Sequence, residues 1–189
     1  MIVLRTGGTI FRRARSLGYL LSSRQTATFR AARQFGAMAS HPNLVLDADE
    51  AIKIAGSAKT VAVLGIKTVA QASQAAYFVP EFLQNTGIDI IPVPVYYPEV
   101  KEILGKSVVR DLKEIKRPVD VLDVFRRPQD LPHHLDDILA MEPAPSCVWL
   151  QSGISNPEFE LKLAEAGVKV VSNRCMKVDR TAAGFRARF

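Results

Sequence analysis

The sequence predicts an α/β fold in which a mainly parallel, doubly wound sheet of five strands carries helices on both faces. Five short apolar runs alternate with segments of helical spacing along most of the chain. The runs are apolar at consecutive positions, which is typical of parallel strands that are covered on both sides. Helical connections join such strands through right-handed crossovers. The predicted architecture is therefore Rossmann-like.

Each strand is expected where an apolar run is bounded by glycine, proline or polar residues. The expected strands are 60–65, 88–93, 119–125, 146–151 and 168–171. A helix is expected over 48–57, because Asp47 is a suitable N-cap and two acidic residues follow in the first turn.

The remaining connections are expected to hold helices and turns. One helix leads to Asn85, and Pro80 either kinks it or lies in its first turn. Pro128 is expected to start a helix that runs to about 141, and Asn156 to cap one over 156–166. We also expect a short segment at 106–109, a helical turn at 111–115 and a C-terminal tail at 181–189.

The composition is that of one globular domain. Hydrophobic residues make up 48% and charged residues 23% of the 189 residues, both ordinary values. No apolar run approaches the ~18 residues of a membrane-spanning helix. Two cysteines are too few for a disulfide framework or a four-cysteine metal site, and three histidines leave little for a metal centre.

The excess positive charge is confined to the first 46 residues. They contain seven arginines and no lysine, aspartate or glutamate. In residues 47–189, 18 basic residues are set against 19 acidic ones, which gives a formal net charge of −1, compared with +6 for the whole chain. The charge of the chain therefore does not indicate that its folded part binds nucleic acid.

Residues 1–46 resemble a mitochondrial transit peptide, because they are rich in Arg, Ser, Thr and Ala and lack acids. The segment Arg33-Gln34-Phe35 is typical of a site cut by a matrix peptidase, with maturation near Gly36. A plastid transit peptide, a basic tail and a true start at Met38 are the alternatives. The folded domain is expected over 47–180, in the mitochondrial matrix.

A ligand is expected beyond the carboxyl ends of the strands, where the strand order of a doubly wound sheet reverses. Gly65 ends the first strand and permits either a close approach to a phosphate or simply a tight turn. The following loop lacks the Gly-x-Gly-x-x-Gly pattern of dinucleotide cofactors and the Gly-x-x-x-x-Gly-Lys-Ser/Thr pattern of ATPases. These absences disfavour a redox cofactor and nearly exclude an ATPase.

Two other strand ends carry polar residues. Arg126 and Arg127 precede a predicted helix, where cations oppose the helix dipole unless an anion binds there. The alternative to a bound anion is that the two arginines pair with nearby aspartates. Gln151 and Gly153 end the fourth strand and are suited either to an adenine or pantetheine amide or to a plain turn.

Several blocks of the sequence resemble small single-domain CoA-binding proteins, whose fold is similar to the nucleotide-binding domain of the succinyl-CoA synthetase alpha subunit. The resemblance covers nearly all of residues 50–178. Its most specific blocks are Asp-Val-Phe-Arg-Arg-Pro at 123–128 and Trp-Leu-Gln-Ser-Gly at 149–153. The other blocks lie at 61–65, 90–94, 103–105 and 170–175.

The resemblance implies a coenzyme A site at the strand ends. The loop from Gly65 to Thr68 would hold phosphates, and Lys67 stands where the family often has serine, which should strengthen anion binding. The implied cofactor-binding residues are Gly65, Ile66, Lys67, Thr68, Ser73, Val93, Pro94, Phe125, Arg126, Gln151, Gly153 and Asn173.

No catalytic residue is predicted. His133 and His134 are expected on a solvated helix face, and Cys175 is interpreted as an inert residue or, alternatively, a redox-active one. The expected function is therefore a non-catalytic CoA- or acyl-CoA-binding protein. The alternatives are an NAD(P)- or other nucleotide-dependent enzyme that uses the same crevice, and a regulatory or ligase-like subunit that needs a catalytic partner. A homodimer is also left open.

Overall fold

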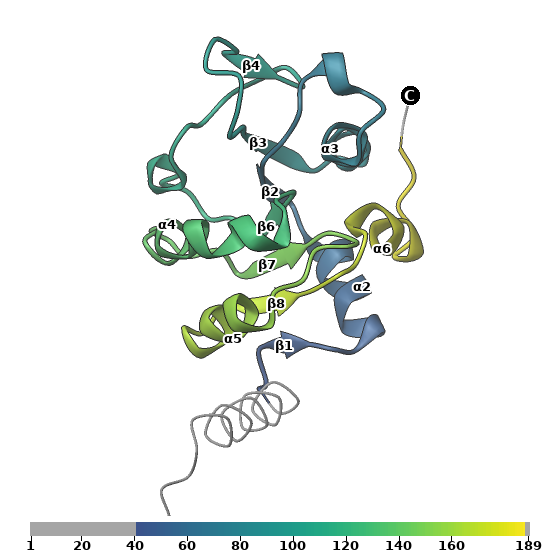
Figure 1. Cartoon of the computed structure of the whole chain (residues 1–189). Helices are drawn as coiled ribbons and strands as arrows, with labels where there is room; N and C mark the ends of the chain where they lie inside the picture. Colours follow the sequence, from purple (N-terminus) through teal and green to yellow (C-terminus); the bar gives the residue numbers. More distant parts are fainter. Residues whose placement is uncertain (1–40, 188–189) are drawn as a thin grey trace, which may run out of the picture. The chain divides into compact units, whose positions relative to one another are not determined.

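A computed structural model describes residues 41–187, all of which belong to one structural unit. Six parallel strands form one sheet in the order β1-β8-β7-β6-β2-β3 (Figure 1). They are β1 (Leu44–Val45), β2 (Thr60–Leu64), β3 (Asp89–Val93), β6 (Val121–Val124), β7 (Cys147–Leu150) and β8 (Lys169–Val171). A separate antiparallel pair is formed by β4 (Glu102–Ile103) and β5 (Lys106–Ser107). The predicted parallel, Rossmann-like α/β fold is confirmed.

Helices cover both faces of the sheet (Figure 1). One face carries α2 (Ala48–Ser57), α3 (Ala75–Asn85) and α6 (Met176–Ala182), and the other carries α4 (Leu135–Leu139) and α5 (Pro157–Glu165). Short 3-10 helices occupy Val69–Gln71, Leu112–Glu114 and Pro128–His134. Each face has its own apolar cluster: Leu83 and Trp149 belong to one, and Leu122 and Phe159 belong to the other.

All five predicted strands form, and the sheet has one strand more than predicted. In the additional strand, Leu44 pairs with Val170 and Val45 with Val171. A two-residue strand has no measurable period, so nothing in the sequence pattern indicated it. The sheet begins before the expected domain start at residue 47. The predicted cleavage site and the alternative start at Met38 lie outside the described residues.

The edge position of β3 explains the proline within it. The carbonyl of Val93 faces β2 and accepts a hydrogen bond from the N–H of Gly65 at 2.8 Å. Pro92, one position earlier, faces away from β2, where its missing N–H leaves no gap in the sheet. On that outer side its carbonyl accepts from the N–H of Val109 at 2.9 Å.

The predicted caps of α2 and α5 are confirmed. The side chain of Asp47 accepts from the N–H of Asp49, and that of Asn156 accepts from the N–H of Phe159. Pro80 lies inside α3.

The single helix predicted over 128–141 is wrong. Residues Pro128–His134 form a 3-10 helix, and α geometry begins only at Leu135. Pro132 lies inside the first part, where it lacks the N–H of an α-helical hydrogen bond and its ring crowds the carbonyl four residues earlier. The terminal helix α6 was not predicted, and the tail begins after it.

The carboxyl ends of three strands meet at one point. Leu64, the last residue of β2, pairs with Val93 of β3 and with Val124 of β6. The chain passes from β2 to β3 on one side, whereas β6 leads to β7 on the other. The strand order therefore reverses between β2 and β6, which is where doubly wound sheets bind ligands.

Candidate functional site

Gly65 is the point at which β2 turns into the loop that was expected to hold phosphate. Its φ is +88°, a backbone conformation that other residues rarely adopt. A Cβ at this position would lie 2.5 Å from the carbonyl oxygen of Phe125. Glycine is therefore required, because the segments that follow β2 and β6 come into contact here.

Lys67 projects from this loop and has no carboxylate partner among residues 41–187. Its Nζ lies 3.3 Å from the hydroxyl oxygen of Tyr97. It also lies 5.0 Å from the ring centre of Tyr96 and 5.4 Å from that of Tyr97. The aromatic faces stabilise the ammonium group without cancelling its charge.

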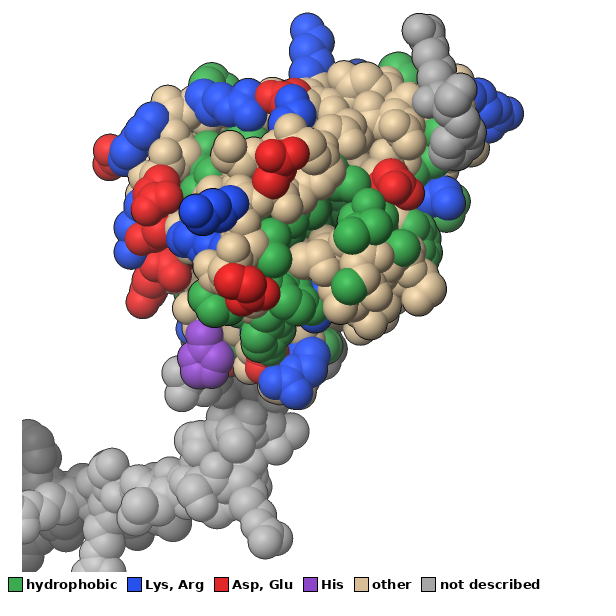
Figure 2. Space-filling model, turned by 90° about the horizontal axis from the view of Figure 1, so that it is seen from above, with side chains coloured by type: hydrophobic (Ala, Val, Ile, Leu, Met, Phe, Trp, Pro, Cys, Tyr) green, Lys and Arg blue, Asp and Glu red, His purple; other side chains and the backbone are tan. Residues whose placement is uncertain are grey.

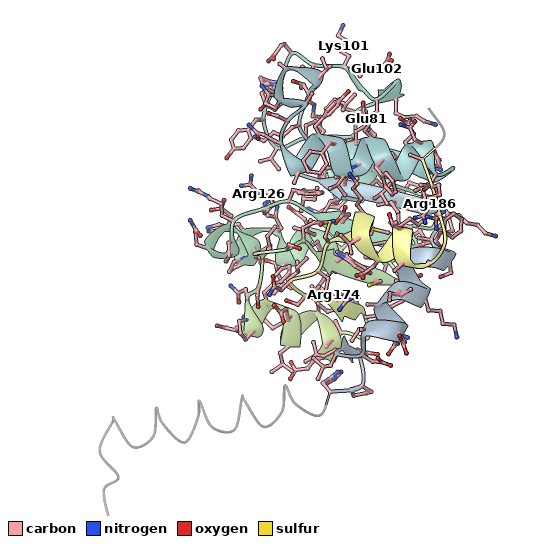
Figure 3. All side chains as sticks on the ribbon, turned by 90° about the vertical axis from the view of Figure 1, so that its right-hand side faces the viewer. Glu81, Lys101, Glu102, Arg126, Arg174 and Arg186 are labelled. Carbon is pink, nitrogen blue, oxygen red and sulfur yellow. The ribbon has the colours of Figure 1, made fainter. Side chains whose placement is uncertain are left out.

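Arg126 approaches the same aromatic ring from the segment after β6. Its Cζ lies 5.5 Å from the ring centre of Tyr96, so the structure brings the two predicted cations, Lys67 and Arg126, against one side chain. The guanidinium lowers the pKa of the Tyr96 hydroxyl through a hydrogen bond and through its charge. Figure 3 shows Arg126 at the edge of the molecule opposite to Arg186.

Asp130 neutralises only part of this positive charge. Its carboxylate lies 3.1 Å from Nη2 of Arg126 and 2.9 Å from Nε of Arg127, so the alternative of arginine pairing with aspartate also holds. One carboxylate serves two guanidinium groups, which leaves one positive charge. The Arg126 side chain is 12% exposed and that of Arg127 is 69% exposed. Only Arg126 is held against the site.

His134 is a site residue that sequence reasoning missed. It is half-buried rather than solvated, and its Nε2 accepts a hydrogen bond from Nε of Arg126 at 3.2 Å. Burial first, and then the charge of Arg126, lower the pKa of the imidazole. The prediction of a regular helix here placed the side chain on the wrong face, because the 3-10 segment rotates residues differently from an α-helix.

A cavity of about 580 Å³ opens beside these groups. Its apolar lining residues include Leu64, Val93 and Pro94, and its polar ones include Arg110 and His134. Of the twelve residues implied by the family resemblance, Val93 and Pro94 line this cavity. An apolar wall next to fixed cations suits a flat, weakly polar group that carries phosphates.

Two acidic residues also line the cavity, and both are bonded to Lys113. Its backbone N–H donates to Asp111 at 2.9 Å, and its Nζ lies 2.8 Å from Asp137. The lysine therefore offsets part of the negative charge on this wall.

Arg110 holds the loop that carries the two tyrosines. Its guanidinium donates to the carbonyls of Tyr97 at 2.9 Å and Pro98 at 3.3 Å, and also to the carbonyl of Val100. Tyr97 itself has a φ of +65°, which a side chain rarely adopts without such support. The position of the aromatic rings is thus built into the loop.

The Gln151 side chain is engaged inside the protein. It is buried, and its Nε2 donates to both carboxylate oxygens of Asp123, at 2.8 and 3.0 Å. The Nε2 group is therefore engaged by Asp123 in this structure, and a contact between Gln151 and a ligand stays a prediction.

Gly153 and Asn173 lie together, at the ends of β7 and β8. The N–H of Gly153 donates to Oδ1 of Asn173 at 2.7 Å, and the N–H of Asn173 donates to the carbonyl of Ile154 at 3.2 Å. Gly153 and Asn173 therefore contact each other, and neither residue lines the cavity.

The other implied residues have mainly local roles. Ile66 is buried in the core, and Phe125 packs against the apolar cluster on the α2, α3 and α6 face. The hydroxyl of Thr68 lies 2.8 Å from Oε1 of Gln71. Ser73 is exposed before α3, and the first turn of that helix has no side-chain cap. The N–H of Tyr77 donates to the carbonyl of Gln74, and those of Ala75 and Ala76 are left for a ligand.

The positive charge of the site is local. Seen from above, the surface shows Lys and Arg interspersed with Asp and Glu around a band of hydrophobic side chains (Figure 2).

No group of three His, Cys, Asp or Glu that could hold a metal ion occurs within 41–187. No helix in the described part of the chain is long and apolar enough to cross a membrane.

The fold and the site define a Rossmann-like α/β protein with cations and a partly apolar cavity at the point where its strand order reverses. The family described as the CoA binding domain matches residues 59–181, and the chain belongs to this family.

Relatives are found in bacteria and archaea. The uncharacterized protein YneT of Bacillus subtilis is 36% identical over 120 residues, which are 64% of this chain and 84% of the relative. The structure of cell-free ID.343 from Thermus thermophilus is similar, with a TM-score of 0.64 and 41% identity, covering 73% of this chain and 99% of that one. A hypothetical protein from Pyrococcus horikoshii OT3 has a TM-score of 0.63 and 25% identity, covering 74% and 93%.

Proposed function

We propose that this chain binds coenzyme A or an acyl-CoA in the crevice between the ends of β2, β3 and β6. The observation that carries the proposal is the convergence of Lys67 and Arg126 on the ring of Tyr96, beside a cavity with an apolar wall, in a member of the CoA-binding family. Charge-assisted hydrogen bonds to phosphate are the strong contacts that such a ligand needs.

The donor set fits the parts of CoA. Lys67, Arg126 and the uncapped first turn of α3 would take phosphate groups, and the wall formed by Val93 and Pro94 would take the adenine. When bound, CoA supplies a thiol that carries acyl groups as thioesters.

Calorimetric titration of CoA into the full chain tests the proposal. Each charge-assisted contact contributes roughly 1.5–3 kcal/mol, so Lys67→Ala and Arg126→Ala should each weaken CoA about tenfold or more. Lys101→Ala, on an exposed lysine outside the cavity lining, is the matched control. Equal affinities in all four proteins would refute this placement, and tighter binding of NAD or ATP than of CoA would favour the nucleotide-enzyme alternative.

We propose further that binding is not followed by chemistry in the isolated chain. His134 is bonded to Arg126 rather than to a nucleophile, so no nucleophile and base are arranged for acyl transfer. Acetyl-CoA incubated with the purified protein should survive as long as in buffer, as measured by chromatography. Turnover that His134→Ala or Cys175→Ala abolishes would show an enzyme, whereas turnover only with an added partner would show a subunit.

The mitochondrial location rests on the composition of residues 1–46 alone. Residues 1–35 fused to a fluorescent reporter should direct it to mitochondria. A reporter that stays in the cytosol or enters plastids would contradict the location.

A further inference from the structure

We propose that His134 is a proton-dependent ligand of the site: it takes up a proton when a phosphate group of CoA binds at Arg126, and it then makes a second charged contact to that phosphate. The inference rests on the proposed function, and it adds a coupling between CoA binding and pH.

The geometry shows why the imidazole is neutral without ligand. Nε2 of His134 accepts the N–H of Arg126 Nε at 3.2 Å, so this nitrogen carries no proton of its own. A protonated ring would lose that bond and place two cations in contact. Burial and Arg126 both lower the pKa of His134.

The groups around His134 come from every element that packs near it. They are Arg126 after β6, Asp130 and His133 on the 3-10 helix, Asp137 on α4, and Arg110, Asp111 and Tyr96 across the cavity. The nearby acids favour a protonated ring, but Asp130 is shared by two arginines and Asp137 is bonded to Lys113. Asp130 and Asp137 therefore mainly stabilise these other cations and favour protonation of His134 only weakly.

A bound phosphate favours the protonated form of His134 over the neutral one. Arg126 uses Nε for His134 and Nη2 for Asp130, and a hydrogen bond from its guanidinium also lowers the pKa of the Tyr96 hydroxyl. A phosphate that binds at this guanidinium cancels the charge that disfavours the imidazolium. Because His134 also lines the cavity, its protonated Nε2 can donate to the same anion, and the ring is more basic in the complex than in the free protein.

The coupling is measured as proton uptake in calorimetric titrations of CoA, at one pH near 7, in two buffers of different ionisation enthalpy. We expect the wild type to take up a fraction of a proton more per CoA than His134→Gln, whose amide oxygen can still accept from Arg126. The comparison cancels titration of the CoA phosphates, because the ligand is the same. His133→Gln, on the exposed neighbour, should behave as the wild type.

The same coupling predicts the pH dependence of affinity. From pH 8 to pH 6 the CoA affinity of the wild type should rise relative to that of His134→Gln, by at most about tenfold per pH unit, since one proton is involved. Histidine nitrogen NMR at pH 7 should show the His134 ring changing from neutral to protonated as CoA is added.

Each outcome separates the two proposals. Equal proton uptake in wild type and His134→Gln, or proton release, would overturn the role of His134 while leaving CoA binding intact. A change of equal size in His133→Gln would also overturn it. A wild-type protein that binds no CoA would overturn the proposed function and this inference together.

Discussion

The carboxyl group of Asp123 lies inside β6, at the centre of the sheet, with no exposure to solvent. Its oxygens accept hydrogen bonds from the Gln151 amide. Burial is the largest influence and raises its pKa to about 7, because a charge is poorly solvated there. The folded protein therefore holds a proton on Asp123 over a pH range in which the unfolded chain has released it.

This difference predicts how stability changes with pH. The contribution of Asp123 is fully present below about pH 4 and is lost as pH rises to about 7, because the folded state binds the extra proton in that window. The loss amounts to ~4 kcal/mol at 1.36 kcal/mol per pKa unit. Urea unfolding from pH 4 to pH 8 should show the decline in the wild type and much less of it in Asp123→Asn. Asp136→Asn, on an exposed helix surface, should keep the wild-type slope; an unchanged slope in Asp123→Asn would contradict the assignment.

The residues of the candidate site show which contacts can be predicted from a sequence. Lys67 and Arg126 were predictable, because they follow strands whose carboxyl ends lie in register at the switch point. The internal hydrogen bond of Gln151 was not predictable. Its partner Asp123 lies 28 residues earlier, and a sequence does not show that two polar side chains meet inside a sheet. His134 was missed because its orientation depends on the 3-10 geometry that Pro132 imposes.

At the scale of elements, the junction after β2 depends on one glycine. A methyl group at Gly65 would lie 2.5 Å from the backbone carbonyl oxygen of Phe125. This carbonyl directly follows β6, so it cannot move away unless the end of that strand moves with it.

Gly65→Ala should therefore destabilise the protein by about 3 kcal/mol or more, since it adds a backbone clash to the ~1 kcal/mol cost of a positive φ. Gly87→Ala is the matched control: its φ is +93°, and nothing lies within 4 Å of the added methyl group. Equilibrium unfolding in urea should rank wild type above Gly87→Ala and Gly87→Ala above Gly65→Ala. Equal losses in both variants would show that the loop shifts easily.

Arg180 joins α6 to the end of α2. Its Nη1 donates to the carbonyls of Ala55 at 2.8 Å and Gly56 at 2.7 Å, and its guanidinium lies 3.4 Å from the ring centre of Phe185. These carbonyls belong to the last turn of a helix, which has no partners of its own for them.

Arg180→Met should cost about 3 kcal/mol, because the substitution keeps an unbranched apolar stem but removes the guanidinium and leaves buried carbonyls unpaired. Arg186→Met, on an exposed residue, should change the free energy of unfolding by less than about 0.5 kcal/mol. Amide hydrogen exchange should show faster exchange in α6 for the first variant alone. Unaltered exchange there would mean that apolar packing, and not Arg180, holds the helix.

The elements that could be predicted share a sequence signal: each strand is a mainly apolar run of three or more residues, and each of the helices begins at a capping side chain. Strands β2, β3, β6, β7 and β8 and the capped helices α2 and α5 satisfy this condition. The two-residue β1 is too short for such a run, and α6 begins at Cys175 without a side-chain cap, so tertiary contacts decide their structure. The overall fold was therefore predictable, while its two ends were not.

At the scale of the whole molecule, residues 47–189 have a formal net charge of −1, so attraction over a long distance cannot bring an anion to the crevice. Binding depends on two cations placed by loops that leave the same edge of the sheet. Because those loops are joined to the central strands β2 and β6, a ligand that holds them together should stabilise the domain as a unit.

This linkage gives the last prediction. At a CoA concentration 100-fold above the dissociation constant, a ligand that binds only the folded state adds about 2.7 kcal/mol, which raises the melting temperature of a protein of this size by roughly 5–10 °C. The full chain should show this increase in a thermal unfolding experiment. Arg126→Ala at the same CoA concentration should show a smaller one, since the variant binds less ligand. Dephospho-CoA compared with CoA then locates the ribose phosphate: if Arg126 contacts it, the two ligands should differ in the wild type and nearly coincide in the variant. Stabilisation of wild type and Arg126→Ala to the same extent would mean that CoA binds at another edge of the sheet.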